Sequence, residues 1–154
     1  MTLEALELVA EDPRKYLRQA MRLEERIKLK LTRIQHLRDM ATKVTTTLNG
    51  AGGHSGTSDK VGNAAAAIAT LSDEVGDDIE RLRELNIEIG IAIVTLIPDE
   101  TCRAVIEARY LAGTWWERIA VDMHYSYRWV MKLHRRGLAL MQKTATEQLE
   151  RGKE

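Results

Sequence analysis

The feature that most constrains the fold of this chain is a seam of mostly apolar residues between positions 61 and 96, spaced alternately four and three apart without interruption. The seam consists of Val61, Ala65, Ile68, Ser72, Val75, Ile79, Leu82, Asn86, Ile89, Ile93 and Leu96. This alternation is the heptad pattern of helices that pack against another helix. A helix of this kind is on the order of 50 Å long, too long to be covered by a domain of about 45 residues. It therefore needs a second helix alongside.

A second long helical pattern precedes the seam and can supply that partner. It opens at Asp12 and Pro13, an N-cap followed by proline at the first helical position. Its apolar stripe consists of Leu23, Ile27, Leu31, Ile34, Leu37, Ala41, Val44 and Leu48. The glycine-rich segment 49–58 between the two patterns predicts a loop. We expect an antiparallel, coiled-coil-like helical hairpin over 13–97, although a homodimer that pairs two chains would cover the same stripes.

Two further details concern this hairpin and its end. Asn86 either fixes the register of the seam or is solvated. Pro98 and Asp99 end the second long helix and cap the next one. The predicted organisation is an N-terminal segment 1–12, the hairpin 13–97, a C-terminal domain 98–145 and a tail 146–154.

Composition agrees with an all-α chain that has one small domain and one extended element. The chain has 154 residues, of which 44% are hydrophobic and 30% charged, with no Phe and only two Pro. Its single cysteine, Cys102, excludes an internal disulfide, and we expect it to be buried beside Val105 or Ile106. No apolar run approaches the roughly 20 residues of a membrane span, and the acidic start is unlike a signal peptide. We expect no membrane contact and a cytoplasmic location.

Residues 114–136 have the pattern of two short helices joined by a tight turn. Thr114 and Glu117 have the spacing of a capping box, and Gly113 suits a left-handed turn before them. The small residue Ala120 leaves room for a crossing helix, and Ser126 is a good N-cap for that helix. The result is three helices within 102–140, the minimum for a helix-turn-helix domain.

The helix that follows Ser126 has one apolar face and one basic face. The residues expected to pack inward at three- and four-residue steps are Val130, Leu133, Gly137 or Leu138, and Met141. The residues expected to face outward are Tyr127, Arg128, Met131, Lys132 and Arg135. The net charge of the chain is zero, but residues 124–146 contain no acid, whereas 59–100 is strongly acidic.

This part of the chain resembles region 4 of sigma factors. More narrowly, it is similar to the sigma-70 region 4-like regulators encoded by bacteriophages and prophages of Gram-positive bacteria. The residues that carry the resemblance are EARYLAG at 107–113, WERIA at 116–120, YS at 125–126, Val130, Leu133, His134 and LAL at 138–140. Residues YL at 16–17, LEERI at 23–27 and LRDMATK at 37–43 resemble the same group, so the likeness covers about 13–145. The resemblance implies DNA binding and contact with host RNA polymerase. We expect an accessory factor, because we see no second domain that could recognise and melt the minus-ten element of a promoter.

The chain departs from this pattern at two places. His124 stands where helix-turn-helix domains usually have glycine, because that turn residue takes a positive φ, so the turn is either strained or differently shaped. Tyr127 and Met131 stand where sigma domains commonly have arginine, so no promoter sequence can be transferred to this chain.

The predicted partner is double-stranded DNA, and the contacts divide by position along the helix. We expect Arg128 and Lys132 to reach base edges in the major groove. Tyr127 could contact a phosphate or a thymine methyl group, and Met131 either a thymine methyl group or the protein core. The remaining residues of the predicted DNA-binding set are Ser126, at the helix start, and Arg135, Arg136 and Lys143, on phosphates. A solvated basic face without a ligand is the alternative.

Other candidate chemistry is weak. Trp115, Trp116 and Trp129 are expected to pack in the core and at its rim, with Trp129 alternatively beside the DNA backbone. The four histidines are His36, His54, His124 and His134, and they lack metal-ligand spacing. We predict no catalytic residue, no cofactor and no metal, and therefore not an enzyme.

The predicted function is a sequence-specific transcription regulator, an activator of a phage or prophage that acts with host RNA polymerase. The first alternative is a phage small terminase subunit that recognises the packaging site. The second is a protein-interaction module that does not bind DNA.

Overall fold

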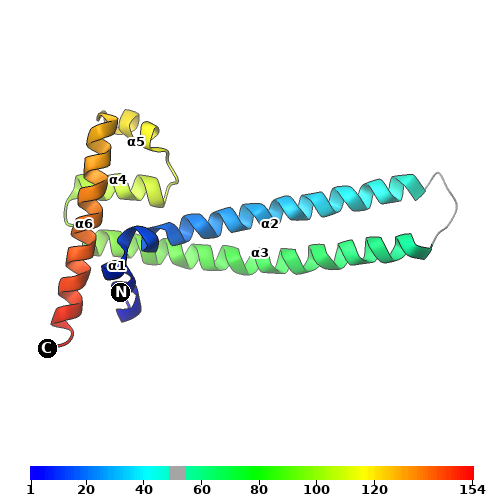
Figure 1. Cartoon of the computed structure of the whole chain (residues 1–154), viewed down its shortest axis with the longest axis horizontal. Coiled ribbons are helices and arrows are strands. Elements are labelled where there is room, and N and C mark those ends of the chain that lie inside the picture. Colours follow the sequence, from blue (N-terminus) through cyan, green and yellow to red (C-terminus); the bar gives the residue numbers. More distant parts are fainter. Residues whose placement is uncertain (49–54) are drawn as a thin grey trace. The chain divides into compact units, whose positions relative to one another are not determined.

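The computed structural model describes residues 1–48 and 55–154, and the chain is all-α in these residues, as predicted. Six helices are formed there: α1 (Leu3–Glu11), α2 (Pro13–Leu48), α3 (Ser55–Leu96), α4 (Glu100–Tyr110), α5 (Trp116–Met123) and α6 (Tyr127–Arg151) (Figure 1). The predicted loop 49–58 is too long at its end, because α3 already begins at Ser55. The rest of that predicted loop lies outside the described residues.

The helices form two compact units. One contains residues 1–22 and 83–154, and the other contains residues 23–82. Helices α2 and α3 each contribute to both units. The boundary predicted between 97 and 98 therefore falls inside the first unit.

In the second unit, α2 and α3 run side by side in opposite directions (Figure 1). The buried residues Leu23, Ile27 and Ile34 of α2 lie on the predicted stripe, and so does Val75 of α3. Every second position of the predicted seam on α3, however, lies one residue earlier than predicted. The residues that are at least partly buried there are Ala64, Leu71 and Asp78, whereas Ala65, Ser72 and Ile79 are exposed. The same shift continues in the first unit, where Leu85 is buried and Asn86 is solvated.

A group of ion pairs explains the most unusual of these seam positions. Asp78 is buried, and its two carboxylate oxygens each lie 2.7 Å from a cation, Oδ1 from Arg26 Nη2 and Oδ2 from Lys30 Nζ. Lys30 also pairs with Glu74 at 3.3 Å. Lys30 takes the inward position predicted for Leu31, which is 49% exposed. Long basic side chains can fill such positions because their aliphatic stems pack while their charged ends remain near water.

Because of the ion pairs of Asp78, we expect the unfolding free energy of the chain to fall at acid pH. Hydrogen bonds from Arg26 and then Lys30 lower the pKa of Asp78 below 3.8. A carboxylate with a lowered folded-state pKa stabilises the fold above its unfolded pKa, and this contribution is lost as the pH falls below about 4. In urea titrations followed by far-UV circular dichroism, Asp78→Asn should reduce the loss of unfolding free energy below pH 4. An unchanged acid dependence in Asp78→Asn would contradict this role.

In the first unit, α1 is a helix that the sequence analysis missed. Thr2 caps it by accepting a hydrogen bond from Ala5 N–H at 3.1 Å, and Val9 is fully buried. Helix α1 packs on α6, where Gln142 Nε2 donates to the carbonyl of Ala10 at 2.8 Å. Helix α6 continues to Arg151, so most of the segment 146–154 is helical.

Helices α4 and α6 approach closely at Gly137. Asp99 caps α4 as predicted, by accepting from Cys102 N–H at 3.0 Å, and Cys102 and Ile106 are fully buried. A β-carbon at Gly137 would lie 2.5 Å from Ile106 Cδ1 and 3.4 Å from Cys102 Cβ. Ile106 has no solvent-exposed surface into which it could move, so only glycine fits without repacking.

We expect Gly137→Val to lower the unfolding free energy by about 1–3 kcal/mol, because it overfills this contact. Gly76 is the matched control, since it also lies inside a helix but a β-carbon there meets nothing within 4 Å. Gly76→Ala should raise the unfolding free energy by about 0.5–1 kcal/mol through helix propensity alone. Denaturant unfolding measures both, and a Gly137→Val protein as stable as the parent would show that the contact is loose.

Candidate nucleic-acid interface

The turn between α5 and α6 depends on His124. This residue ends α5 in the left-handed conformation, with φ 57° and ψ 38°. Its backbone N–H donates to the carbonyls of Ala120 and Val121, and Tyr125 N–H donates to Ala120 at 3.0 Å. The departure at His124 therefore leaves the positive φ in place, and histidine adopts a conformation that glycine would adopt with less strain. Gly113, with φ 68°, makes the predicted left-handed turn after α4.

The two helix starts near this turn differ. Ser126 caps α6 as predicted, since its hydroxyl oxygen accepts from Trp129 N–H at 3.1 Å. The predicted capping box at the start of α5 is wrong, because its N-cap is Trp115 and no side chain caps it. With the helix starting one residue later than expected, Thr114 and Glu117 are out of register for reciprocal capping. The backbone of Thr114 instead bonds to α4, from its N–H to the Ala108 carbonyl at 2.9 Å.

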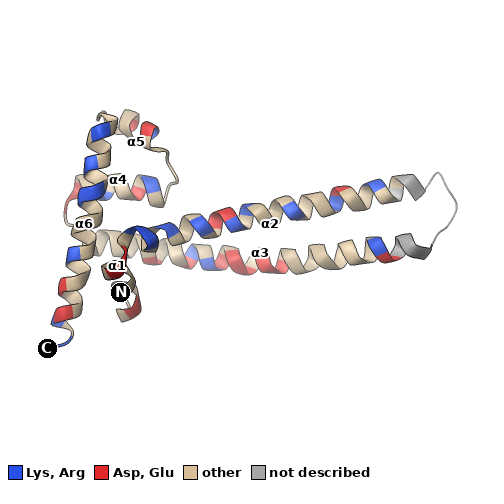
Figure 2. Ribbon diagram, viewed as in Figure 1, with Lys and Arg blue, Asp and Glu red and all other residues tan. Residues whose placement is uncertain are grey.

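Helix α6 has the two faces that the sequence predicts. Its inward residues Val130, Leu133, Gly137 and Met141 are buried. Of the outward residues, Tyr127, Arg128, Lys132 and Arg135 are exposed, whereas Met131 is half-buried. Figure 2 shows Lys and Arg on the first half of this helix and acidic residues near its C-terminal end.

The predicted DNA-binding cations fall into two groups. Arg136 Nη2 lies 3.7 Å from Asp99 Oδ2, and Lys143 Nζ lies 4.0 Å from Glu147 Oε1. These two cations are thus partly neutralised by the protein itself. Arg128, Lys132 and Arg135 form no ion pair with any residue in 1–48 or 55–154. They are the positive charges on this face that remain available to an external anion.

The three tryptophans lie in different environments. Trp116 is half-buried, with its ring centroid 4.5 Å from that of His134, which fits the predicted packing role. Trp115 is 70% exposed, and Trp129 is 44% exposed on α6. The Arg109 guanidinium lies 5.0 Å from the ring centroid of Trp115 and 5.3 Å from that of Trp116. Because Trp129 is exposed, it presents aromatic surface beside the exposed cations Arg128 and Lys132 of the same helix.

Sequence reasoning missed the buried polar pair beneath this face. His134 is 2% exposed, and its Nε2 lies 2.8 Å from the Tyr110 hydroxyl, while its Nδ1 has no hydrogen-bond partner in the described part of the chain. Burial, and then repulsion from nearby arginines, lowers the pKa of His134 from 6.5 to about 4. The available signal was position, since His134 follows the inward Leu133 and lies four residues after the inward Val130.

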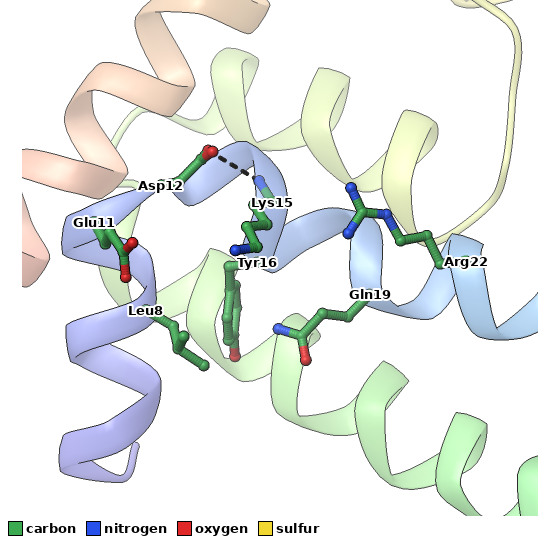
Figure 3. Close-up of a pocket in the computed structure, with 7 residues that line it drawn as sticks. All are labelled: Leu8, Glu11, Asp12, Lys15, Tyr16, Gln19 and Arg22. Carbon is green, nitrogen blue, oxygen red and sulfur yellow. Dashed lines mark hydrogen bonds between the residues drawn. The ribbon is translucent and has the colours of Figure 1, made fainter.

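A small pocket of about 250 Å³ lies where α1 meets the start of α2 (Figure 3). Its lining residues are Leu8, Glu11, Asp12, Lys15, Tyr16, Gln19 and Arg22. As predicted, Asp12 caps α2 by accepting from the Lys15 backbone N–H at 3.0 Å. The pocket mixes both signs of charge, so it has no clear preference for one class of ligand.

The described residues form neither a metal site nor a membrane-spanning helix. No three His, Cys, Asp or Glu side chains gather there as a metal site. None of the described helices has the length and apolar character needed to cross a membrane.

Comparison of the chain with protein-family models, with curated proteins and with solved structures found no match.

Proposed function

We propose that this chain is a sequence-specific DNA-binding transcription regulator of a bacteriophage or prophage, which acts as an accessory factor with host RNA polymerase. The observation that carries the proposal is the exposed face of α6, where Arg128, Lys132 and Arg135 have no acidic partner among the described residues. That face begins directly after a left-handed turn and a serine-capped helix start. No catalytic role is proposed.

In this proposal, α5 and α6 act as a helix-turn-helix, with α6 in the major groove. Arg128 and Lys132 lie one turn apart near the start of α6, and they would contact base edges. Ser126, Tyr127 and the partly exposed Met131 would lie at the groove edge. Arg135 would bind phosphate, and Arg136 and Lys143 would contribute less, because each already has an acidic partner.

The test is DNase footprinting on DNA that flanks the gene of this protein, with random-sequence duplex as competitor. We expect a protected site that survives the competitor. Equal binding to both DNAs would contradict sequence-specific recognition. A failure to bind any duplex at low salt would instead favour the protein-interaction module, in which this domain contacts polymerase alone.

One observation favours an assembly of several copies. Helix α3 leaves Ile87, Ile91 and Val94 exposed at four- and three-residue spacing, beside Gly90. In the described structure, the stripes of α2 and α3 already cover each other within one chain, so a homodimer would use this other stripe. Two copies would place two DNA-reading domains on one site.

The same exposed stripe could also close a ring, and a small terminase subunit is therefore the second candidate function. Light scattering on the intact protein separates the two candidates. A dimer supports the regulator, whereas a ring of roughly eight or more subunits supports the terminase subunit. A monomer that is unaffected by Ile91→Asp would exclude both forms of self-association.

A further inference from the structure

The start of α2 carries a second group of positive charges in the same unit as α6. Residues 13–22 contain Arg14, Lys15, Arg18 and Arg22 and no acid. Arg14, Arg18 and Arg22 recur every four residues, so they share one face of the helix, and all three are exposed. The opposite face is buried through Tyr16, Leu17 and Ala20. Figure 2 shows this cluster of basic residues at the first turns of α2.

Of these four basic residues, Arg14 and Arg18 are the two that lie away from the acidic groups of the pocket in Figure 3. Lys15 and Arg22 share the pocket of Figure 3 with Glu11 and Asp12, so acidic groups lie near them. Arg14 and Arg18 do not line that pocket, and neither forms an ion pair with a residue of the described structure. Arg14 also lies within hydrogen-bonding reach of the Tyr110 hydroxyl, but no carboxylate of the described residues neutralises either arginine.

Arg14 and Arg18 lie near the cations of two other helices. Arg14 lies beside the Tyr110 hydroxyl, which is 2.8 Å from His134 Nε2, and Arg135 directly follows His134 in α6. The positive charges of Arg14, Arg109, Arg135 and Arg18 also help to lower the pKa of His134, after burial. The same unit thus brings arginines from α2, α4 and α6 around the His134–Tyr110 pair. Arg109 is already bound to the Thr114 carbonyl at 3.3 Å, whereas Arg135 belongs to the exposed face of α6. Arg135 thus lies on the exposed face of α6 and shares the surroundings of His134 with Arg14 and Arg18.

Gathering unpaired cations on one surface works against folding through repulsion, and a bound polyanion would relieve that repulsion. We propose that Arg14 and Arg18 form a second contact surface, which extends the face of α6 from Arg135 and binds the phosphate backbone of duplex DNA. This inference rests on the proposed function, and it assigns affinity without sequence preference to the start of α2. Arginine suits this role because its planar fork donates two hydrogen bonds to one phosphate.

The test is the double variant Arg14→Gln/Arg18→Gln, compared with Arg33→Gln/Arg38→Gln. Both pairs are exposed, lie on α2 and remove the same charge, but the control pair lies in the second unit. Fluorescence anisotropy would follow binding to the footprinted duplex and to a random-sequence duplex of about 30 base pairs over a series of salt concentrations. Circular dichroism and thermal melting would confirm that each variant is folded.

We expect Arg14→Gln/Arg18→Gln to weaken binding to both duplexes by the same factor, roughly 10- to 50-fold at low salt, and to reduce the slope of log Kd against log salt by nearly 2. Arg14→Lys/Arg18→Lys should recover most of the slope, because it restores the charge. If the parent binds DNA but the glutamine variant keeps its Kd and slope, the second surface is excluded while the proposed function stands. An equal effect of the control pair would also overturn the inference, because general charge would then explain the loss. If the parent binds neither duplex, the proposed function fails and the second surface falls with it.

Discussion

Replacing Arg128 and Lys132 together with alanine is expected to weaken binding to the footprinted DNA by roughly 30- to 1000-fold, since a good base contact contributes about 1–3 kcal/mol. Both side chains are exposed near the start of α6, and neither has an acidic partner among the described residues. Binding to random duplex should weaken by a smaller factor, because the loss there is only that of two charges attracted to phosphate. Anisotropy titrations at a fixed salt concentration would measure both affinities.

Arg151→Ala is the matched control for this prediction. Arg151 is exposed and lies in the last turn of the same helix, so its loss changes the net charge without touching the start of α6. It should leave both affinities nearly unchanged. The base-contact assignment would be contradicted if the double variant weakened specific and random binding by the same factor, since that is the behaviour of phosphate contacts.

The local features of this face could be predicted because they depend on neighbouring residues. The cap at Ser126 and the left-handed turn at Gly113 follow from single side chains and from backbone sterics. The inward stripe from Val130 to Met141 follows from helical periodicity. The capping box failed because it depends on the exact first residue of α5, and helix boundaries are the least certain part of such patterns.

The features that depend on distant residues could not be predicted in this way. A period of three and four residues fits the seam of α3 equally well with Ile79 or Asp78 inward, and hydrophobicity alone chooses Ile79. The pairing of Asp78 with Arg26 and Lys30, which lie about 50 residues away, reverses that choice. Likewise, the partial neutralisation of Arg136 becomes visible only when α4 brings Asp99 near it.

Acidification is expected to destabilise the unit that contains His134 well before most carboxylates titrate. The folded-state pKa of His134 is about 4, compared with 6.5 without the protein environment, because the imidazolium form is desolvated and then repelled by Arg14, Arg109, Arg135 and Arg18. Between these two pKa values the unfolded chain binds a proton that the folded chain does not bind. Stability due to His134 is therefore fully present above pH 6.5 and decreases as the pH falls toward 4, by about 3 kcal/mol in total.

Trp116 lies against His134, so tryptophan fluorescence during urea unfolding at each pH between 7 and 5 would report this unit. His134→Gln should flatten the fall, because it removes the titrating group while keeping a polar side chain for Tyr110. Tyr110→Phe is the control, since it loses the hydrogen bond at 2.8 Å but keeps the buried imidazole and hence the fall. A parent protein whose unfolding free energy stays constant from pH 7 to 5 would show that the imidazole is open to water.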